Sequence, residues 1–589
     1  MSGVELGKEL RERADALREE LDGLLLELPE AKGAVHAALR RATEALVRFC
    51  ELGLTDEGIG ALGELRLATL GAKEALAPER AELDGPLLDE AVAWVDDLKR
   101  RALDKLPPPT ALAERARKLE QVDPFRASVG TPALHRPFEV PAPEILEKRR
   151  DFLALPPDDD APASGVRERS LAELELARLG REAMEDIAIL GGLRRSKDEQ
   201  LWADASGFER RLLANLDALW SLDRPVRVDS PRLGVPRALF AYLTEWSFPD
   251  WGRAFALAFT LGCTDSDAAL RWVVLALRRA EPGVVDAFVS GLALASGPGI
   301  GRAALAELGA DVTPLNTAAW LEVAERKGAF EAGAVVPLLA HPDESVRSRA
   351  ARCLRHAPKE LAIEALLELL RDASPQVAAD AADELAVRGR SEGLGYLRMS
   401  LDRALRTPPS GDDAGLDGPA LVALRALSLT AEPSDEELLL RAAKRDPKAL
   451  RFLGWYGRPA HVGLLLSELE AARARGPEGY AAAEAAEEAI TRITGVQAAL
   501  PLAELGAAVA RLSEESPAYR DAKRARHGRP FEAALVLDEL EKPITRQRHR
   551  RMLARELAVV LPAAPRCDVD DWVARQQVTL ALLRTMLSR

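Results

Sequence analysis

The residues closest to a metal-site pattern are Cys353 and His356, a single C-x-x-H pair in a segment of helical periodicity. One such pair supplies at most two ligands, whereas a structural zinc site needs four. The remaining cysteines, Cys50, Cys263 and Cys567, are scattered along the chain and form no second pair. We therefore expect no bound metal and no disulfide framework, and the sparse cysteines are typical of a reducing compartment.

The stretch richest in glycine is Gly297-Pro298-Gly299-Ile300-Gly301. Glycine-rich turns can cradle phosphate groups, but this one lacks the G-x-G-x-x-G spacing and no Walker lysine follows it. The segment before it has a helical pattern, whereas a dinucleotide-binding turn follows a strand. We interpret the stretch as a turn before a helix, and expect no cofactor.

Catalytic groups are not brought together by any spacing in the sequence. The chain has no H-E-x-x-H or G-x-S-x-G motif, and no partner residue stands at a fixed spacing from its seven histidines. Asp568, Asp570 and Asp571 resemble an acidic metal loop, but we interpret them as N-terminal caps of a last helix, Trp572 to Leu587. We therefore expect no catalytic residue and no enzymatic activity.

A basic block stands out in this acidic chain of net charge -14. Between Arg520 and Arg555 there are eleven Lys or Arg against five Asp or Glu. The block is either a solvated face paired with acidic residues elsewhere in the chain, or a docking surface for an acidic protein partner. Nucleic acid is not expected, because no aromatic residues interleave for base stacking. The candidate partner-binding residues are Arg546, Arg548, Arg550, Arg551 and Arg555 on one predicted helix, and Arg347 on an earlier one.

The elements that position these residues are predicted to be helices. The composition is 47% hydrophobic and 5% aromatic, rich in Ala, Leu, Glu and Arg and poor in β-branched runs of strand length, so we expect an all-α fold.

Residues 331–387 contain one helix pair written twice, with rows of apolar residues that recur after 31 positions (377 − 346 = 31): Val346, Ala350 and Leu354, then Val377, Ala381 and Leu385. A fixed period of this length predicts a right-handed α-solenoid, in which each pair hides its apolar face only by stacking on its neighbours.

A second recurrence supports the repeat interpretation. Ala269, Val273 and Leu277 return 31 residues later (300 − 269 = 31) as Ile300, Ala304 and Leu308. An extra helix near Thr317 to Arg326 is predicted before the next copy. Pro342 stands just before a predicted helix, where its fixed φ and missing donor cost little, and either Asp343 or Ser345 can cap the free amides of that helix.

The run Pro342-Asp343-Glu344-Ser345-Val346-Arg347-Ser348-Arg349-Ala350-Ala351-Arg352-Cys353-Leu354 resembles the second helix of a HEAT repeat of the phycobilisome-lyase-like kind. The second copy departs from this pattern, because Ala378 stands where the usual Arg is found. The resemblance implies a helical-repeat fold and does not imply lyase activity, since most proteins with such repeats are binding scaffolds.

A second resemblance involves Arg526-His527-Gly528-Arg529-Pro530-Phe531, Gln547-Arg548-His549-Arg550-Arg551 and Glu488-Ala489-Ile490-Thr491-Arg492-Ile493-Thr494-Gly495. Together these runs are similar to an uncharacterised bacterial family of HEAT-repeat proteins, well represented in myxobacteria and sometimes encoded near type VI secretion genes. The similarity covers roughly residues 170–589.

The predicted organisation has six parts: 1–106, an N-terminal four-helix bundle or coiled coil; 107–168, a proline-rich linker; 169–406, a HEAT-like α-solenoid; 407–419, a loop; 420–512, further irregular helical repeats; and 513–589, a basic C-terminal helical segment. The leucine stripe of the first part fits an intramolecular bundle or a homodimer through the N-terminal helices. In the linker, Phe125, Leu134 and Phe138 predict that its middle packs along a helical domain.

These observations lead to three functional hypotheses. The first is a non-enzymatic scaffold that binds a protein partner through its solenoid surface. The second, implied by the resemblance, is an accessory component of a type VI-like secretion system that binds a secretion protein or an effector. The third is a lyase-like enzyme, which would need a pocket with a positioned acid and nucleophile. The polar N-terminus and the lack of a long apolar run predict a cytoplasmic protein without membrane association.

Overall fold

The structure is a computed structural model, and it describes residues 13, 16–23, 33–52, 65, 68–69, 72–73, 86–93, 130–137, 171–195, 197–224, 232–244, 249–310, 312–407, 415–498 and 500–588. These residues belong to two compact units, Met1–Lys118 and Leu119–Arg589. Nearly all the described elements are helices, so the prediction of an all-α fold is confirmed.

In the first unit, α2 (Gly33–Leu52) is accompanied by helical residues at 16–23 and 86–93. The apolar side chains of these stretches share one core, which includes Leu17, Leu39 and Leu88. Part of the predicted leucine stripe is therefore buried within a single chain. The homodimer stays a prediction, since the beginning and end of the stripe lie outside the described residues.

The α-helices of the second unit follow one another with short connections: α7 (Leu171–Arg194), α8 (Trp202–Ser221), α9 (Val235–Thr244), α10 (Trp251–Gly262), α11 (Asp267–Arg278), α12 (Val285–Leu294), α13 (Ile300–Leu308), α14 (Pro314–Arg326), α15 (Ala332–Val335), α16 (Glu344–Cys353), α17 (Lys359–Leu369), α18 (Pro375–Val387), α19 (Ser391–Arg406), α20 (Gly418–Thr430), α21 (Glu436–Arg445), α22 (Leu450–Tyr456), α23 (Val462–Ala474), α24 (Tyr480–Thr494), α25 (Leu502–Glu515), α26 (Pro517–Arg520), α27 (Ala533–Leu540), α28 (Gln547–Val560) and α29 (Val573–Leu587).

Short 3-10 helices adjoin several of these: η2 (Pro282–Val284), η3 (Val336–Ala340), η4 (Leu354–His356), η5 (Pro433–Asp435), η6 (Pro447–Ala449), η7 (Pro459–His461) and η8 (Gly476–Gly479). The two strands, β1 (Ala525–Arg526) and β2 (Arg529–Pro530), form one antiparallel hairpin. His527 and Gly528 connect them with positive φ angles, the backbone conformation of a two-residue hairpin turn.

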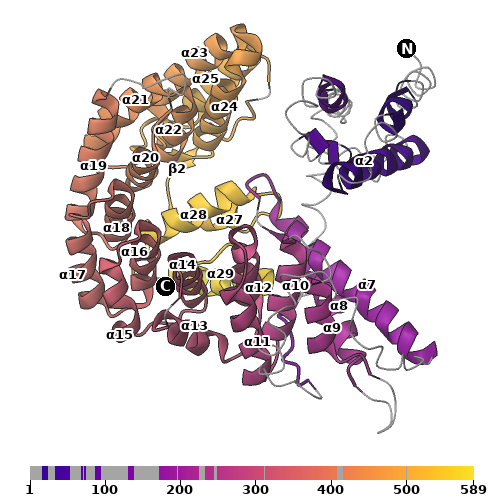
Figure 1. The fold of residues 1–589 in the computed structure, drawn as a ribbon. Coiled ribbons are helices and arrows are strands. Elements are labelled where there is room, and N and C mark those ends of the chain that lie inside the picture. The colour runs from indigo at the N-terminus through magenta and orange to yellow at the C-terminus, as the bar shows by residue number, and fades with distance from the viewer. Residues whose placement is uncertain are drawn as a thin grey trace. The chain divides into compact units, whose positions relative to one another are not determined.

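Helices α10 to α24 are stacked in a continuous row. Each even-numbered helix packs on the next even-numbered one from α10 to α24, while odd-numbered helices such as α13, α17, α19 and α23 pack beside them. Figure 1 shows that the row follows a curve, with the odd-numbered helices on its outer side. We call this curved row of helices the arc.

The rows of apolar residues predicted from the 31-residue recurrence form the interior of the arc. All twelve residues of the four rows are buried, and they lie on α11, on α13, on α16 with η4, and on α18. The predicted extra helix is α14, which interrupts the spacing between α13 and α16. Asp343 caps α16 as expected, because its Oδ1 accepts hydrogen bonds from Ser345 N at 2.8 Å and Val346 N at 3.4 Å.

Glycine allows the closest approach between neighbouring helices of the arc. A Cβ atom on Gly454 of α22 would lie 2.5 Å from the Cα of Ala489 on α24, which is closer than two carbon atoms can approach. Only glycine at this position lets α22 and α24 pack at their observed separation.

The described middle of the proline-rich linker, residues 130–137, binds the second unit. His135 N donates to Cys263 O and Asp265 N donates to His135 O, both at 2.9 Å. The His135 ring is stacked on Trp220 with centroids 5.6 Å apart. Burial lowers the pKa of His135, with Asp217 opposing the shift. These residues pack on a helical domain as expected, but through His135, since Leu134 is 46% exposed. Phe125, Phe138 and the rest of the linker lie outside the described part.

Residues 533–588, which contain α27, α28 and α29, form what we call the C-terminal segment. It lies on the inner side of the arc, where α28 packs against α18 and α20 (Figure 1). Its apolar residues share one buried cluster with Trp202 of α8, Leu429 of α20 and Trp455 of α22. The segment is therefore packed against both early and late helices. Among the helices that the structure describes, none combines the length and the apolar character needed to cross a membrane.

Candidate functional site

The helix that carries most of the predicted partner-binding arginines begins against a distant part of the chain. No side chain caps α28, whose N-cap residue is Arg546. Instead, Gln547 N donates to Gln200 O at 2.8 Å, and Arg548 N donates to Asp198 O at 3.0 Å. Because the first amides of a helix have no partner inside it, these carbonyls from the α7–α8 connection satisfy the start of α28.

Arg546 and Arg551 are the most exposed of the five arginines, with side chains 46% and 41% exposed. Arg546 Nη1 lies 2.7 Å from Glu199 Oε2, and Arg551 Nη1 donates to Asp198 Oδ1 at 2.7 Å. Exposed ion pairs of this kind contribute only about 0–1 kcal/mol to stability, so both arginines could exchange these partners at little cost.

Arg548 and the neighbouring His549 connect α28 to α24. Arg548 lies 2.7 Å from Glu199 and donates to Glu484 at 2.9 Å. His549 Nε2 is 3.0 Å from Glu488 Oε1. Burial opposes the ionisation of Glu488, but the hydrogen bond from His549 and the charges of His549, Arg492 and Arg548 outweigh it and lower the pKa of Glu488 to about 2. These contacts bind α28 both to the α7–α8 connection and to α24.

Arg550 lies in the interior of the protein. It has no exposed surface, and its guanidinium carbon is 3.8 Å from the ring centroid of Trp202. It donates to Gln576 Oε1 at 2.6 Å and to the backbone oxygen of Leu540. Burial lowers the pKa of Arg550 to about 9. A partner could contact this residue only if the C-terminal segment moved.

Arg555 is paired with two consecutive carboxylates of α18. Its Nη2 lies 2.7 Å from Asp383 Oδ2, and its Nη1 donates to Glu384 Oε1 at 3.0 Å. Arg566, in the connection between α28 and α29, donates to Glu384 Oε2 at 2.9 Å. Burial opposes the ionisation of Glu384, but Arg555 and Arg566 hold its pKa well below its usual range. The Glu384 carboxylate is therefore ionised, and both of its oxygens accept hydrogen bonds from arginines of the same chain.

Arg347 lies on α16 and has a different role from the five arginines of the C-terminal segment. Its Nε and Nη2 donate to the two carboxylate oxygens of Asp372, each at 2.8 Å, and its Nη1 donates to His341 O. The hydrogen bond from Arg347 lowers the pKa of Asp372. Because Asp372 lies just before α18, this two-pronged contact joins successive helix pairs.

The predicted acidic caps of α29 are only part of what holds its N-terminus. Asp571 Oδ1 accepts from Trp572 N at 2.7 Å, outside the helix. The first helical amide, Val573 N, donates instead to both oxygens of Glu209 on α8, at 3.3 and 3.0 Å. Glu209 is buried, which raises its pKa, and Arg194 opposes this shift through a 2.8 Å hydrogen bond. Glu209 stands in an ordinary helical pattern, so no signal in the sequence identified it.

The densest group of buried charges was also not predicted from the sequence. The guanidinium carbons of Arg492 and Arg526 lie 3.5 and 5.3 Å from the ring centroid of Trp455. Arg492 donates to Glu539 at 2.9 Å, and Arg526 donates to Glu556 at 2.6 Å. Arg526 lies in the β1–β2 hairpin, and its position beside the His-Gly turn is the one local signal that could have located it.

Cys353 and His356 do not converge on a metal. Cys353 Sγ donates to Leu321 O at 3.2 Å, and His356 Nε2 is 2.7 Å from Glu325 O. Burial raises the pKa of Cys353 to about 12, so its thiol is protonated at neutral pH. Both side chains bind backbone oxygens of α14. The part of the chain that the structure describes contains no group of three or more His, Cys, Asp or Glu placed to hold a metal ion.

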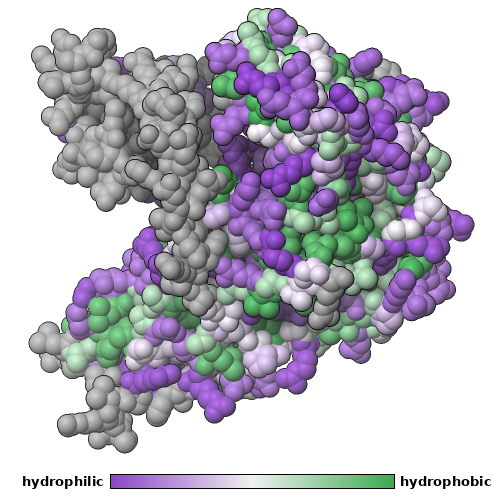
Figure 2. Space-filling view, turned by 180° about the vertical axis from the view of Figure 1, so that it is seen from behind, coloured by the Kyte–Doolittle hydropathy of each residue, from purple (hydrophilic) through white to green (hydrophobic). Residues whose placement is uncertain are grey.

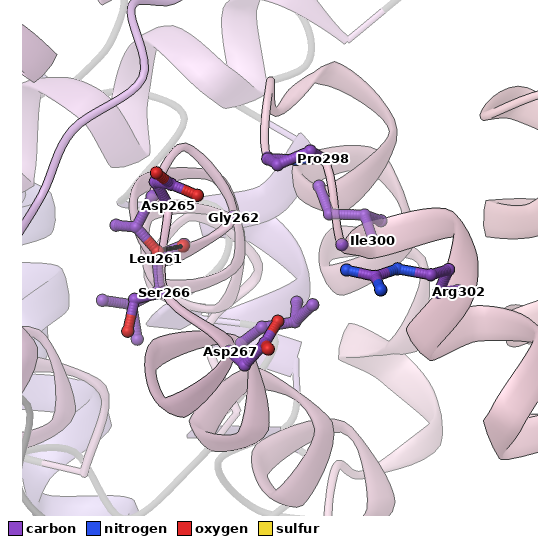
Figure 3. A pocket seen from close by; sticks show the side chains of 12 residues that line it. Leu261, Gly262, Asp265, Ser266, Asp267, Pro298, Ile300 and Arg302 are labelled. Atoms are coloured by element: carbon purple, nitrogen blue, oxygen red, sulfur yellow. Dashed lines mark hydrogen bonds between the residues drawn. The ribbon is translucent and has the colours of Figure 1, made fainter.

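The glycine-rich stretch forms a turn directly before α13, as predicted. Gly297 N donates to Gly262 O at 2.8 Å, and a Cβ at Gly297 would lie 2.3 Å from that oxygen, so no other residue fits. The turn lines a cavity of about 160 Å³ together with the start of α11. Asp265, Asp267 and Arg302 lie around it (Figure 3). Its lining is mixed in charge and holds no constellation of nucleophile and base.

Comparisons of the chain with protein-family models, curated proteins and solved structures find no match. The chemistry of the site is therefore inferred from its geometry. The arginines of the C-terminal segment pair with carboxylates from three distant parts of the chain, and this arrangement is suited to positioning and binding.

Proposed function

We propose that the protein is a non-enzymatic helical-repeat scaffold, a right-handed HEAT-like α-solenoid that binds another protein through its surface. The continuous packing of even-numbered helices from α10 to α24 supports the repeat architecture. So does the burial of the apolar rows that recur after 31 residues. A stacked array of this kind has a large surface in proportion to its core, which suits it to protein binding.

The observation that carries this proposal is that α29 is apolar on two faces. One face, with Val573, Leu580 and Leu583, is buried. The other exposes Val578 and Leu582, which are 72% and 51% exposed. Met586 continues this second row at the same spacing of four residues and is 41% exposed. Helices that are apolar all round are normally buried, so the exposed row, which we call the α29 stripe, is suited to contact with another protein.

Apolar side chains are not spread evenly over the second unit. On the face shown in Figure 2 they gather near the middle, surrounded by hydrophilic residues. Contiguous apolar areas on a protein surface commonly mark binding sites.

The basic face of α28 is the second location for binding, as predicted from the sequence. An acidic partner there would have to compete with the carboxylates that already pair with the arginines. Arg546 and Arg551 are the best placed for such an exchange, because they are the most exposed and their partners Glu199 and Asp198 are exposed as well; Arg551 also pairs with the partly exposed Asp570 at 3.3 Å.

The test compares three forms of the tagged protein used as bait in extracts of its own host: the natural sequence, the double variant Val578→Glu with Leu582→Glu, and the control Met399→Glu. Met399 is an exposed apolar residue on α19, so the control adds a charge to an exposed apolar position away from the stripe. Mass spectrometry identifies a partner retained in stoichiometric amount, and sedimentation of the purified protein shows whether that partner is a second copy.

We expect the partner to be retained by the natural sequence and the control and lost from the α29 double variant. Retention by all three forms would exclude the α29 stripe. A further form, Arg546→Glu with Arg551→Glu, tests the basic face. Loss of the partner from this form, or from the natural sequence at high salt, would indicate binding at the basic face. If no partner is retained by the natural sequence, the scaffold proposal is overturned.

A further inference from the structure

We propose that the C-terminal segment is a brace that sets the curvature of the arc by linking its early helices to its late ones. This inference does not depend on which partner the protein binds. It rests on the contacts at the two ends of the segment and on the way curvature arises in a stacked helical array.

One end of the brace is attached to the early helices through the residues that begin α29. Trp572 is fully buried, and its Nε1 donates to Leu294 O at the end of α12 at 2.6 Å. Val573 N is bound by Glu209 of α8. Arg326 of α14 donates to the backbone oxygen of Asp570 at 3.2 Å. Four early helices take part, because Arg194 at the end of α7 also donates to the backbone oxygens of residues 570 and 571.

The other end is attached to the late helices. Arg555 and Arg566 pair with the carboxylates of α18, and His549 pairs with Glu488 of α24. Apolar contacts accompany these ion pairs, since Leu553 and Leu557 of α28 share a cluster with residues of α20 and α22. Asp383 and Glu384 are largely buried and also pair with Arg425 and Arg388, so removing Arg555 and Arg566 would leave each of these buried charges with fewer counter-charges.

A single helix spans the distance between the two ends. The first turn of α28 is bound both to the α7–α8 connection and to α24, and its third turn reaches α18. Residues 198–200 and 383–384 are thus held to opposite parts of one rigid helix, although more than a hundred and eighty positions separate them in the chain.

This connection matters because of how a stacked array bends. Each layer touches only its neighbours, so curvature is the sum of many small rotations and the ends can move with little cost at any one layer. A rigid link between distant layers removes that freedom. The two ends of the arc cannot separate unless the contacts of the brace break first. The brace also occupies the inner side of the arc, so a partner that binds there contacts the brace itself.

The experiment measures the separation of the two ends in the full-length protein. Spin labels are attached through Ala214→Cys on α8 and Ala471→Cys on α23, both exposed positions of the second unit, with Cys50 replaced by Ser. The brace variant is Arg548→Glu with His549→Glu, which places negative charges against Glu199, Glu484 and Glu488. The control is Arg584→Glu, which breaks an exposed ion-pair set with Asp538 and Glu541 that lies wholly within the C-terminal segment.

We expect the brace variant to shift the label distances to longer values by roughly 8–10 Å, the spacing of one packed helix, and to broaden their distribution. The control should leave the distribution unchanged, and circular dichroism should show the same helical content in all forms. An unchanged distance in a folded brace variant would overturn the proposal. If the double variant fails to fold, Arg548→Ala, which removes the shared partner of Glu199 and Glu484, is measured in the same way and decides the question by the same shift.

Discussion

The helix pairs around residues 331–387 and the C-terminal segment are both helical and both buried on one side, but different interactions hold them. In the helix pairs, neighbours in sequence supply most of the contacts, and the side chains that pack are those of Ala, Leu and Val. In the C-terminal segment, many contacts are polar and join residues separated by hundreds of positions, such as Trp572 with Leu294.

The difference shows two ways of burying a helix. A repeated helix pair presents an apolar face to the next pair, so burial follows from the periodic pattern and needs no specific partner. A helix that crosses the inner side of an arc meets surfaces from many layers, including helix ends with unsatisfied backbone groups. There it is held by specific hydrogen bonds and buried ion pairs. Removing one member of a buried ion pair is costly, because the charge of the other member stays buried without a partner.

The largest expected effect is at the start of α29. Glu209→Gln should lower the free energy of local opening of α29 by about 3–5 kcal/mol, because it leaves the Arg194 charge buried without a counter-charge. Hydrogen exchange of the α29 amides measures this opening. Glu182→Gln, which removes an exposed carboxylate paired with Arg178 on α7, is the matched control and should change exchange little. Equal effects of the two variants would refute the importance of the buried pair.

A core substitution in the helix pairs should have a somewhat smaller effect that remains local. Leu385→Ala in α18 should lower the opening free energy of α18 by about 2–5 kcal/mol, since Leu385 is fully buried in an apolar cluster. The increase in hydrogen exchange should reach the neighbouring layers and leave α29 unaffected. Leu421→Ala, at an exposed position of α20, serves as the control. Destabilisation of α29 as strong as that of α18 would remove the contrast between the two regions.

The third prediction uses pH to separate the charged contacts from the apolar ones. The folded pKa of Glu488 is about 2, below its ordinary value of 4.5, so its contribution to stability is fully present above about pH 4.5 and is lost as the pH falls through 2. Glu488→Gln should therefore cost about 3 kcal/mol at neutral pH and progressively less below pH 4.5.

Thermal unfolding of the two proteins from pH 7 to pH 2 gives the measurement. Glu484→Gln is the control, since Glu484 is an exposed carboxylate of the same helix paired with Arg548. A difference between the natural protein and Glu488→Gln that stays constant down to pH 2 would show that His549, Arg492 and Arg548 have no net charge interaction with Glu488.

The features that could be predicted from the sequence are those that depend on residues close together in the chain. A cap such as Asp343 depends on residues within a few positions, and the structure confirms it. The apolar rows of α16 and α18 were located for the same reason, because periodicity within a helix determines which face is apolar. The interpretation of Asp568, Asp570 and Asp571 as caps was incomplete, because the decisive acceptor, Glu209, comes from another helix.

The partners of the five arginines of the C-terminal segment could not be predicted from the residues near them in the chain. Their number and their helix could be predicted, and both interpretations of their role, pairing within the chain and docking of a partner, were open. The structure places carboxylates of α18, α24 and the α7–α8 connection against them, and it separates an exposed pair, Arg546 and Arg551, from the buried Arg550. Binding of a partner by these residues stays a prediction.

The sequence by itself determined that the chain is helical, where the repeated helix pairs lie and which of their faces is apolar, because these properties depend on residue type and on spacing within one or two turns. Only the tertiary structure decided that the C-terminal segment occupies the inner side of the arc, that Glu209 completes the start of α29 and that Trp455 lies among buried arginines. These contacts join surfaces that meet only after the layers have stacked, and no periodic pattern along the chain encodes which distant residues will face one another.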